Sequence, residues 1–98
     1  IDISQLRNIC KKWRINELSL FGSVLRDDFS PESDIDVLVS FEANSPWSLW
    51  DLMVLKEELG NLFNGRSVDL VEKEAIRNPW RKREILRTRE IIYAPGRQ

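Results

Sequence analysis

The sequence predicts a single α/β domain over residues 1–98, in which helices flank a small mixed β-sheet of three to four strands. Segments with apolar residues at helical spacing alternate along the chain with short segments of strand-like alternation. The length of 98 residues fits one domain, and a hydrophobic content of 42% is enough for a core that needs no disulfide bridges.

The first half of the chain predicts a helix followed by two strands. Asp2 and Gln5 form the pattern of a helix cap, after which apolar residues recur at helical spacing. Gly22 and Ser23 interrupt the first strand-like segment and open a turn. In order, the expected elements are a helix over 3–13, a strand over 17–21, a helical turn over 24–27 and a strand over 35–41.

The second half predicts two capped helices and two further strands. Ser48 with Asp51 forms a second capping pair, and Asn78 before Pro79 marks a third helix start. The expected elements are a helix from 48 to 63, a strand over 67–71, a helix from 78 to 89 and a short strand over 91–93. An apolar stripe on the helix at 48–63 is expected to face the core: Trp50, Met53, Val54, Leu59, Leu62 and Phe63.

Composition narrows the chemistry of any site. The chain has no histidine, which excludes histidine general bases and the usual His or Cys zinc sites. A bound metal must therefore be held by oxygen, which favours Mg²⁺ or Mn²⁺. The single cysteine, Cys10, is expected to be a buried, inert thiol and indicates a reducing cytoplasm. No apolar run reaches membrane-spanning length, so no membrane association is expected.

Charge is distributed unevenly along the chain. Residues 77–98 carry seven basic and two acidic side chains, a net charge of +5. The preceding 76 residues carry eight basic and fourteen acidic side chains, a net charge of −6. This asymmetry hints at an anionic ligand or partner near the basic end, although for so short a segment a solvated helix face is the slightly favoured explanation.

Two aspartates stand one residue apart where the strand at 35–41 begins. Residues i and i+2 of a strand point to the same face, so Asp34 and Asp36 converge on one side, with their Cα atoms roughly 6.5 Å apart. Like charges this close repel each other unless a cation lies between them. Asp69 interrupts the apolar segment at 67–71, where a buried carboxylate is costly without a partner. If the two strands are neighbours, three carboxylates form a cradle for divalent ions, as in two-metal nucleotidyl transfer.

The turn at Gly22 and Ser23 predicts an anion site. Glycine lets the backbone approach a phosphate closely, and backbone N–H groups of such a turn bind anions. Arg26, one turn later, is placed to pair with a phosphate or with the acidic cluster.

Each of these signals has a simpler structural explanation when it is taken alone. Asp34 and Asp36 occur in a stretch, SDID, that is more often a turn with solvated acids, and Gly22-Ser23 is usually only a turn. Asp69 fits a charge that protects an edge strand from aggregation, and Arg26 fits an ordinary surface residue. The combined spacing is what favours a site.

That combined spacing resembles the signature of the minimal nucleotidyltransferases, a family of the DNA polymerase β-like superfamily. The motif reads Gly22-Ser23-x-x-Arg26-x-Asp28-x-Ser30-x-x-Ser33-Asp34-x-Asp36-x-x-Val39, and Asp69 stands where the superfamily places its third carboxylate. The likeness extends through nearly the whole chain to the NPW, EIL and IIY segments near its end.

The resemblance implies a fold, a site and a reaction. The fold would be the nucleotidyltransferase core. Gly22, Ser23, Arg26 and Ser33 would bind the nucleotide, while Asp34, Asp36 and Asp69 would be the catalytic, metal-binding carboxylates for two Mg²⁺ ions, with Mn²⁺ as an alternative. Asp69 would also help to activate the attacking hydroxyl. The enzyme would transfer AMP from ATP, or another nucleoside monophosphate from its triphosphate, and release pyrophosphate.

The resemblance also implies a partner. Family members of this size often stand beside a helical HEPN-domain toxin as its antitoxin, and some adenylylate a tyrosine of that toxin. A second interpretation is a binding module that neutralises its partner by contact alone, for which Trp47, Trp50 and Trp80 are candidate contacts. Nucleic-acid binding is not favoured, because the total charge is balanced and no binding motif is present.

Overall fold

The computed structural model describes residues 1–26, 30 and 32–95, and its elements follow the predicted order. They are α1 (Ile3–Lys12), β1 (Ile15–Phe21), the 3₁₀ turn η1 (Gly22–Leu25), β2 (Ile35–Phe41), α2 (Leu49–Leu62), β3 (Val68–Glu72), the 3₁₀ turn η2 (Lys73–Ala75), α3 (Pro79–Thr88) and β4 (Glu90–Tyr93). The predicted α/β class with a small mixed sheet is confirmed. None of the helices in these described residues is long and apolar enough to cross a bilayer.

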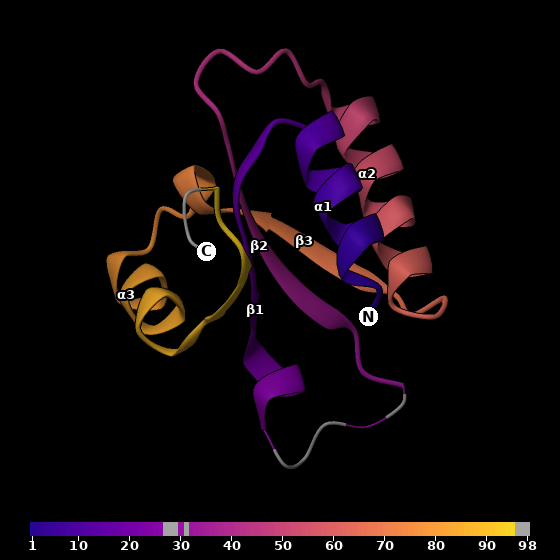
Figure 1. Cartoon of the computed structure of the whole chain (residues 1–98). Helices are drawn as coiled ribbons and strands as arrows, with labels where there is room; N and C mark the ends of the chain where they lie inside the picture. Colours follow the sequence, from indigo (N-terminus) through magenta and orange to yellow (C-terminus); the bar gives the residue numbers. More distant parts are fainter. Residues whose placement is uncertain (27–29, 31, 96–98) are drawn as a thin grey trace.

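The four strands form one sheet in the order β3-β2-β1-β4. β1 pairs antiparallel with both β2 and β4, whereas β2 and β3 run parallel. α2 makes the crossover that a parallel pair requires. As Figure 1 shows, α1 and α2 lie together on one face of the sheet, and α3 lies on the other side.

The helix starts form as their capping residues predicted. The side chain of Asp2 accepts hydrogen bonds from the backbone N–H groups of Ser4 and Gln5. Ser48 and Asp51 form a reciprocal capping box at the start of α2. The side-chain oxygen of Asn78 accepts hydrogen bonds from two backbone N–H groups in the first turn of α3. These caps satisfy N–H groups that would otherwise lack partners in the first helical turn.

Strand alternation divides the sheet between two cores. Val37 and Val39 of β2 pack into the main core with α1 and α2, which also buries Cys10 as predicted. Leu38, between those two valines, belongs to a smaller cluster with Phe21 and Ile85 of α3. Asp36 shares the parity of Leu38, so its side chain lies on the α3 face of the sheet.

The predicted apolar stripe of α2 is wrong in its first half. Trp50, Met53 and Val54 are 78%, 61% and 50% exposed, while Leu55 and Leu59 are fully buried. The helix is apolar around much of its circumference, so the sequence alone did not show which side meets the sheet. The sheet is met by the side that carries the two leucines, roughly opposite Trp50 and Met53 on the helical wheel.

β1 and η1 both begin earlier than the pattern predicted. β1 starts at Ile15, which is buried and pairs with Phe41. The register shifts between Ile15 and Glu17, and this irregularity breaks the alternation from which the strand was predicted. η1 starts at Gly22 rather than at residue 24 and ends at Leu25. Asp28 of the motif lies outside the described residues.

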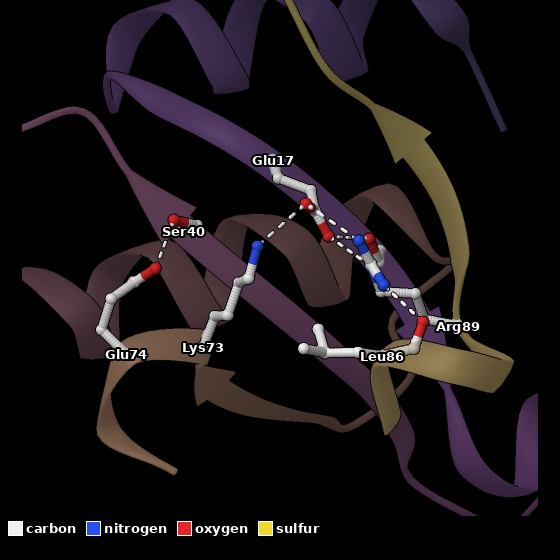
Figure 2. A network of polar contacts seen from close by, with 7 residues as sticks. Glu17, Ser40, Lys73, Glu74, Leu86 and Arg89 are labelled. Carbon is white, nitrogen blue, oxygen red and sulfur yellow. Dashed lines mark hydrogen bonds and ion pairs between the residues drawn. The ribbon is translucent and has the colours of Figure 1, made fainter. Parts of the chain in front are cut away.

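A network of hydrogen bonds and ion pairs connects β1 to residues of η2 and to the end of α3 (Figure 2). Glu17 accepts a hydrogen bond from Nε of Arg89 at 2.6 Å and forms an ion pair with Nζ of Lys73 at 3.5 Å. Burial alone would raise the pKa of Glu17, but the hydrogen bonds from Arg89 and Ser19 and the charges of Lys73 and Arg89 lower it below its ordinary value. Arg89 also donates to the backbone carbonyl of Leu86, which joins the end of α3 to the sheet.

Candidate active site

The turn that follows β1 packs directly against the carboxylate of Asp36 in β2. Gly22 has a φ of +72°, a backbone conformation that residues other than glycine rarely adopt. A Cβ atom at this position would stand 2.3 Å from Oδ2 of Asp36. Glycine is therefore required here for two reasons, the backbone angle and the closeness of the carboxylate.

Strand pairing brings the predicted carboxylates together. Asp36 is paired with Phe21 of β1 on one side and with Asp69 of β3 on the other. Because Asp36 and Asp69 are direct partners in the parallel ladder, their side chains lie on the same face of the sheet. The carboxylate of Asp36 also accepts a hydrogen bond from the backbone N–H of Ser23. The expectation that the two strands are neighbours is confirmed.

Asp36 lies at the electrostatic centre of this cluster. Burial raises its pKa above the ordinary aspartate value, and the negative charges of Asp69 and Asp34 raise it further. The hydrogen bond from Ser23 and the positive charge of Arg26 act in the opposite direction. All of these groups are therefore close enough to Asp36 to interact with it, and the remaining repulsion favours a bound cation.

The other predicted residues surround this centre with different degrees of exposure. Asp34, Arg26 and Asp69 are all exposed. Asp69 therefore does not carry the burial cost that its apolar strand had suggested. Ser33 is half-buried, and its hydroxyl lies 3.0 Å from the hydroxyl of Ser30. A contact between Ser33 and a nucleotide stays a prediction.

The donor atoms suit a hard divalent cation. Asp34, Asp36 and Asp69 offer only carboxylate oxygens, the ligands that Mg²⁺ and Mn²⁺ prefer. In the described part of the chain, no three acidic, cysteine or histidine side chains are grouped tightly enough to hold an ion as they stand. Asp34 and Asp69 are both exposed, so their carboxylates have room to turn toward an ion beside Asp36. The residues present thus fit a divalent metal.

Sequence analysis missed Arg66, which the structure places at the edge of this site. Its Nη2 atom donates to the backbone carbonyl of Ser33 at 2.6 Å and to that of Ser30 at 3.2 Å. A single arginine ahead of a strand carries no periodic or motif signal. Both hydrogen bonds join residues more than thirty positions apart in the sequence, and local spacing does not reveal such contacts.

A hollow of about 500 Å³ opens beside Asp34. Arg66 lines it together with Met53 and Lys56 of α2. Met53 belongs to the exposed apolar part of α2, which also includes Leu49, Trp50 and Val54. The hollow therefore connects Asp34 to an apolar helix face on the α2 side of the sheet, whereas Asp36 lies on the α3 face.

Comparison with known proteins identifies one family. The family model described as "Nucleotidyltransferase domain" matches residues 3–92. A protein of Methanocaldococcus jannaschii named "putative protein adenylyltransferase" is 37% identical over 82 residues, which span 84% of this chain and 79% of that protein. The protein adenylyltransferase MntA of Thermococcus cleftensis is 32% identical over 87 residues, which span 89% of this chain and 82% of that protein.

Solved structures share the same fold. A structure described as a "putative minimal nucleotidyltransferase" has a TM-score of 0.68 and 31% identity, covering 95% of this chain and 96% of that chain. A toxin–antitoxin structure with AMP-PNP has a TM-score of 0.73, covering 98% of this chain and 76% of that chain. Its identity of 15% makes the second likeness one of fold alone.

Proposed function

The chain belongs to the nucleotidyltransferase family, and from that premise we propose that it is a Mg²⁺-dependent protein adenylyltransferase that acts in the cytoplasm. The observation that carries the proposal is the packing of the Gly22 turn against Asp36, with Asp69 directly paired beside it. This arrangement sets an anion-binding turn next to a carboxylate cluster. A nucleoside triphosphate with bound divalent cations has the matching charges.

Different residues of the chain would bind the phosphates, hold the metal ions and accept the proton. The backbone at Gly22 and Ser23, with Arg26 and Ser33, would hold the triphosphate. Asp34, Asp36 and Asp69 would hold two Mg²⁺ ions, which neutralise charge on the phosphates and align the reacting oxygens. Asp69 would also accept the proton of the attacking hydroxyl. An oxygen–phosphorus bond forms at the α-phosphate, the bond to the bridging oxygen breaks, and pyrophosphate leaves.

We propose a protein as the acceptor, specifically a tyrosine hydroxyl of a HEPN-domain toxin. Relatives at 32–37% identity are named protein adenylyltransferases, which supports a protein acceptor. The surface supports it too, because the exposed apolar residues of α2 continue through the hollow to Asp34. A protein bound on that part of α2 would bring a hydroxyl close to Asp34, the one of the three carboxylates that lines the hollow.

Transfer of labelled nucleotide tests this function directly. The chain is incubated with Mg²⁺, ATP labelled at the α-phosphate and the protein encoded beside it. We expect label on the partner with α-labelled ATP and none with γ-labelled ATP, which separates AMP transfer from phosphorylation. EDTA and Asp36→Asn should each abolish labelling. Label that persists in EDTA would refute the metal-dependent mechanism.

A second candidate function is neutralisation of the partner by contact alone. The exposure of Trp50 and Trp80, at 78% and 74%, favours it, because tryptophan often dominates binding energy at interfaces. Trp47 is a weaker candidate, since its ring packs against Trp13 and its Nε1 donates to the Trp13 carbonyl. If Asp36→Asn still neutralises the toxin as well as the unaltered protein does, contact is sufficient and catalysis is dispensable.

A further inference from the structure

Arg66, just before β3, forms hydrogen bonds with the segment that leads into β2. Its Nη2 atom donates to the carbonyl oxygens of Ser30 and Ser33, at 3.2 and 2.6 Å. Those two residues also close on each other, because the N–H of Ser33 donates to the Ser30 carbonyl at 3.0 Å. Ser33 immediately precedes Asp34. The guanidinium group thus binds the backbone of both serines just ahead of the carboxylate pair.

The backbone of Arg66 is itself firmly placed. Its N–H donates to the carbonyl of Phe63 at 3.3 Å, at the end of α2. A Cβ atom on Gly60 would stand 2.8 Å from the Arg66 carbonyl oxygen, so glycine lets this segment lie against the helix. The next residue, Ser67, accepts the N–H of Ile35 at 2.9 Å, where the parallel pairing of β2 and β3 starts. Arg66 therefore extends from a rigid base.

Arginine suits this task better than other donors. Two carbonyl oxygens that face the same nitrogen need a donor that carries more than one N–H and keeps a fixed orientation. The planar guanidinium provides this, and its permanent charge strengthens bonds to carbonyl oxygens. Lysine would supply the charge on a flexible stem, without the planar geometry.

We infer that Arg66 is a positioning residue, which fixes the backbone of Ser30 and Ser33 so that Asp34 and Asp36 enter the site in a metal-binding arrangement. The inference rests on the proposed function, because it assigns Arg66 a role in the metal site described there. Arg66 acts through the backbone that carries the two aspartates. Groups that orient metal ligands commonly change metal affinity by about 10- to 100-fold when they are removed.

Amide hydrogen exchange tests the positioning step without any metal. In Arg66→Ala, the amide of Ser33 should exchange about tenfold faster, because the carbonyls of Ser30 and Ser33 lose the donor that holds them. The amide of Ile35 belongs to the sheet and should keep its exchange rate, so it serves as an internal control. Arg7→Ala, at an exposed position of α1, should change neither amide. An unchanged Ser33 rate in Arg66→Ala overturns the inference, whatever the metal does.

Mn²⁺ binding then tests the consequence for the site. We expect Arg66→Ala to weaken Mn²⁺ binding about tenfold or more, Arg66→Lys to weaken it less, and Arg7→Ala to leave it unchanged. The measurements are made well below the melting temperature of each variant, and Arg66→Lys carries the comparison if Arg66→Ala does not fold. A merely structural arginine would lower the melting temperature without changing the Mn²⁺ affinity of the folded protein.

The outcomes separate the two proposals. If the unaltered protein binds Mn²⁺, Asp36→Asn does not, and Arg66→Ala binds as tightly as the unaltered protein, then the Arg66 inference is wrong and the metal site stands. If the unaltered protein and Asp36→Asn bind Mn²⁺ equally weakly, the proposed function is wrong, and the role of Arg66 in it is wrong as well.

Discussion

The backbone of Gly22 lies so close to the carboxylate of Asp36 that no side chain fits between them. The ideal Cβ position on Gly22 is 2.3 Å from Oδ2 and 3.2 Å from Cγ of Asp36. Gly22 belongs to the turn after β1 and Asp36 belongs to β2. The antiparallel pairing of Phe21 with Asp36 brings the two residues together. This relationship joins the proposed anion-binding turn to the carboxylate cluster and makes the site sensitive to a single methyl group at Gly22.

Gly22→Ala should damage binding more than its effect on the backbone alone would explain. The added methyl group must displace the Asp36 carboxylate or the turn, and a shift of about 1 Å in such a site can cost about 100-fold in activity. We expect Mg²⁺-ATP affinity, measured by calorimetry, to fall at least about tenfold. Gly65→Ala is the matched control, since Gly65 has a φ of +80° but nothing within 4 Å of its Cβ position.

Both glycine variants should lose stability through their left-handed backbone, by about 1 to 2 kcal/mol. Only Gly22→Ala should lose nucleotide binding. Equal binding by the two variants would mean that the closeness of Gly22 to Asp36 has no part in holding the nucleotide.

Asp36→Asn should keep or increase stability while it removes the response to metal. Asp36 is repelled by Asp69 and Asp34, so neutralising it relieves strain in the metal-free protein. In EDTA, we expect the variant to be as stable as the unaltered protein or more stable by about 0.5 to 2 kcal/mol. Thermal melts in EDTA and in excess Mg²⁺ measure both effects. A variant that is less stable in EDTA and still responds normally to Mg²⁺ would show that Asp36 is structural.

Glu17 should make the stability of the protein depend on pH in the acidic range. Its pKa is lower in the folded state than in the unfolded chain, so the ionised form stabilises the fold. This contribution is fully present above the ordinary glutamate value of about 4.3 and is lost as the pH falls through the lowered folded-state pKa. At pH 7, Glu17→Gln should cost about 2 kcal/mol, the scale of a hydrogen bond to a charged group.

Denaturant titrations between pH 3 and 7 check this expectation. The difference between Glu17→Gln and the unaltered protein should shrink toward the acidic end of the range. Glu84→Gln is the control, because Glu84 also pairs with an arginine, Arg87, but is exposed to solvent, so its loss should change stability little. A constant difference at every pH would mean that the charge of Glu17 is not what stabilises the fold.

The apolar part of α2 should be needed for the partner and not for ATP. We expect Trp50→Ser and Met53→Ser each to weaken partner capture at least about tenfold, as buried anchors at interfaces do. Calorimetry should show unchanged Mg²⁺-ATP binding in both variants. Ile3→Ser, at a similarly exposed apolar position of α1, is the control. Partner loss with Ile3→Ser and none with the α2 variants would move the docking surface to α1.

The basic residues of α3 should influence how fast the partner is captured. Surface charge mainly steers association, so reversing Arg83 and Arg87 to Glu should lower the association rate, most visibly at low salt. Surface plasmon resonance at two ionic strengths measures this rate. If the variant associates as fast as the unaltered protein at both salt concentrations, α3 is a solvated face with no part in binding.

Local sequence signals determined most of the secondary structure. Capping residues such as Asp2, Ser48 and Asn78 act within a few positions, so they can be read without knowing the rest of the fold. β2 has the predicted bounds because β-branched and aromatic residues, which favour strands, dominate its sequence IDVLVSF. Where a bulge disturbed the alternation, at the start of β1, the predicted strand began two residues late.

The carboxylate cluster was likewise within reach of the sequence, because residue type and spacing placed Asp34 and Asp36 on one face and identified Asp69 as a third candidate. The pairing of Asp36 with Asp69, the 2.3 Å approach to Gly22 and the two hydrogen bonds from Arg66 were decided by the tertiary structure. So was the exposure of Trp50 and Met53. The physical reason is the same in each case: a periodic pattern records which residues share a face, whereas strand neighbours, helix orientation and long-range donors depend on how distant segments pack together.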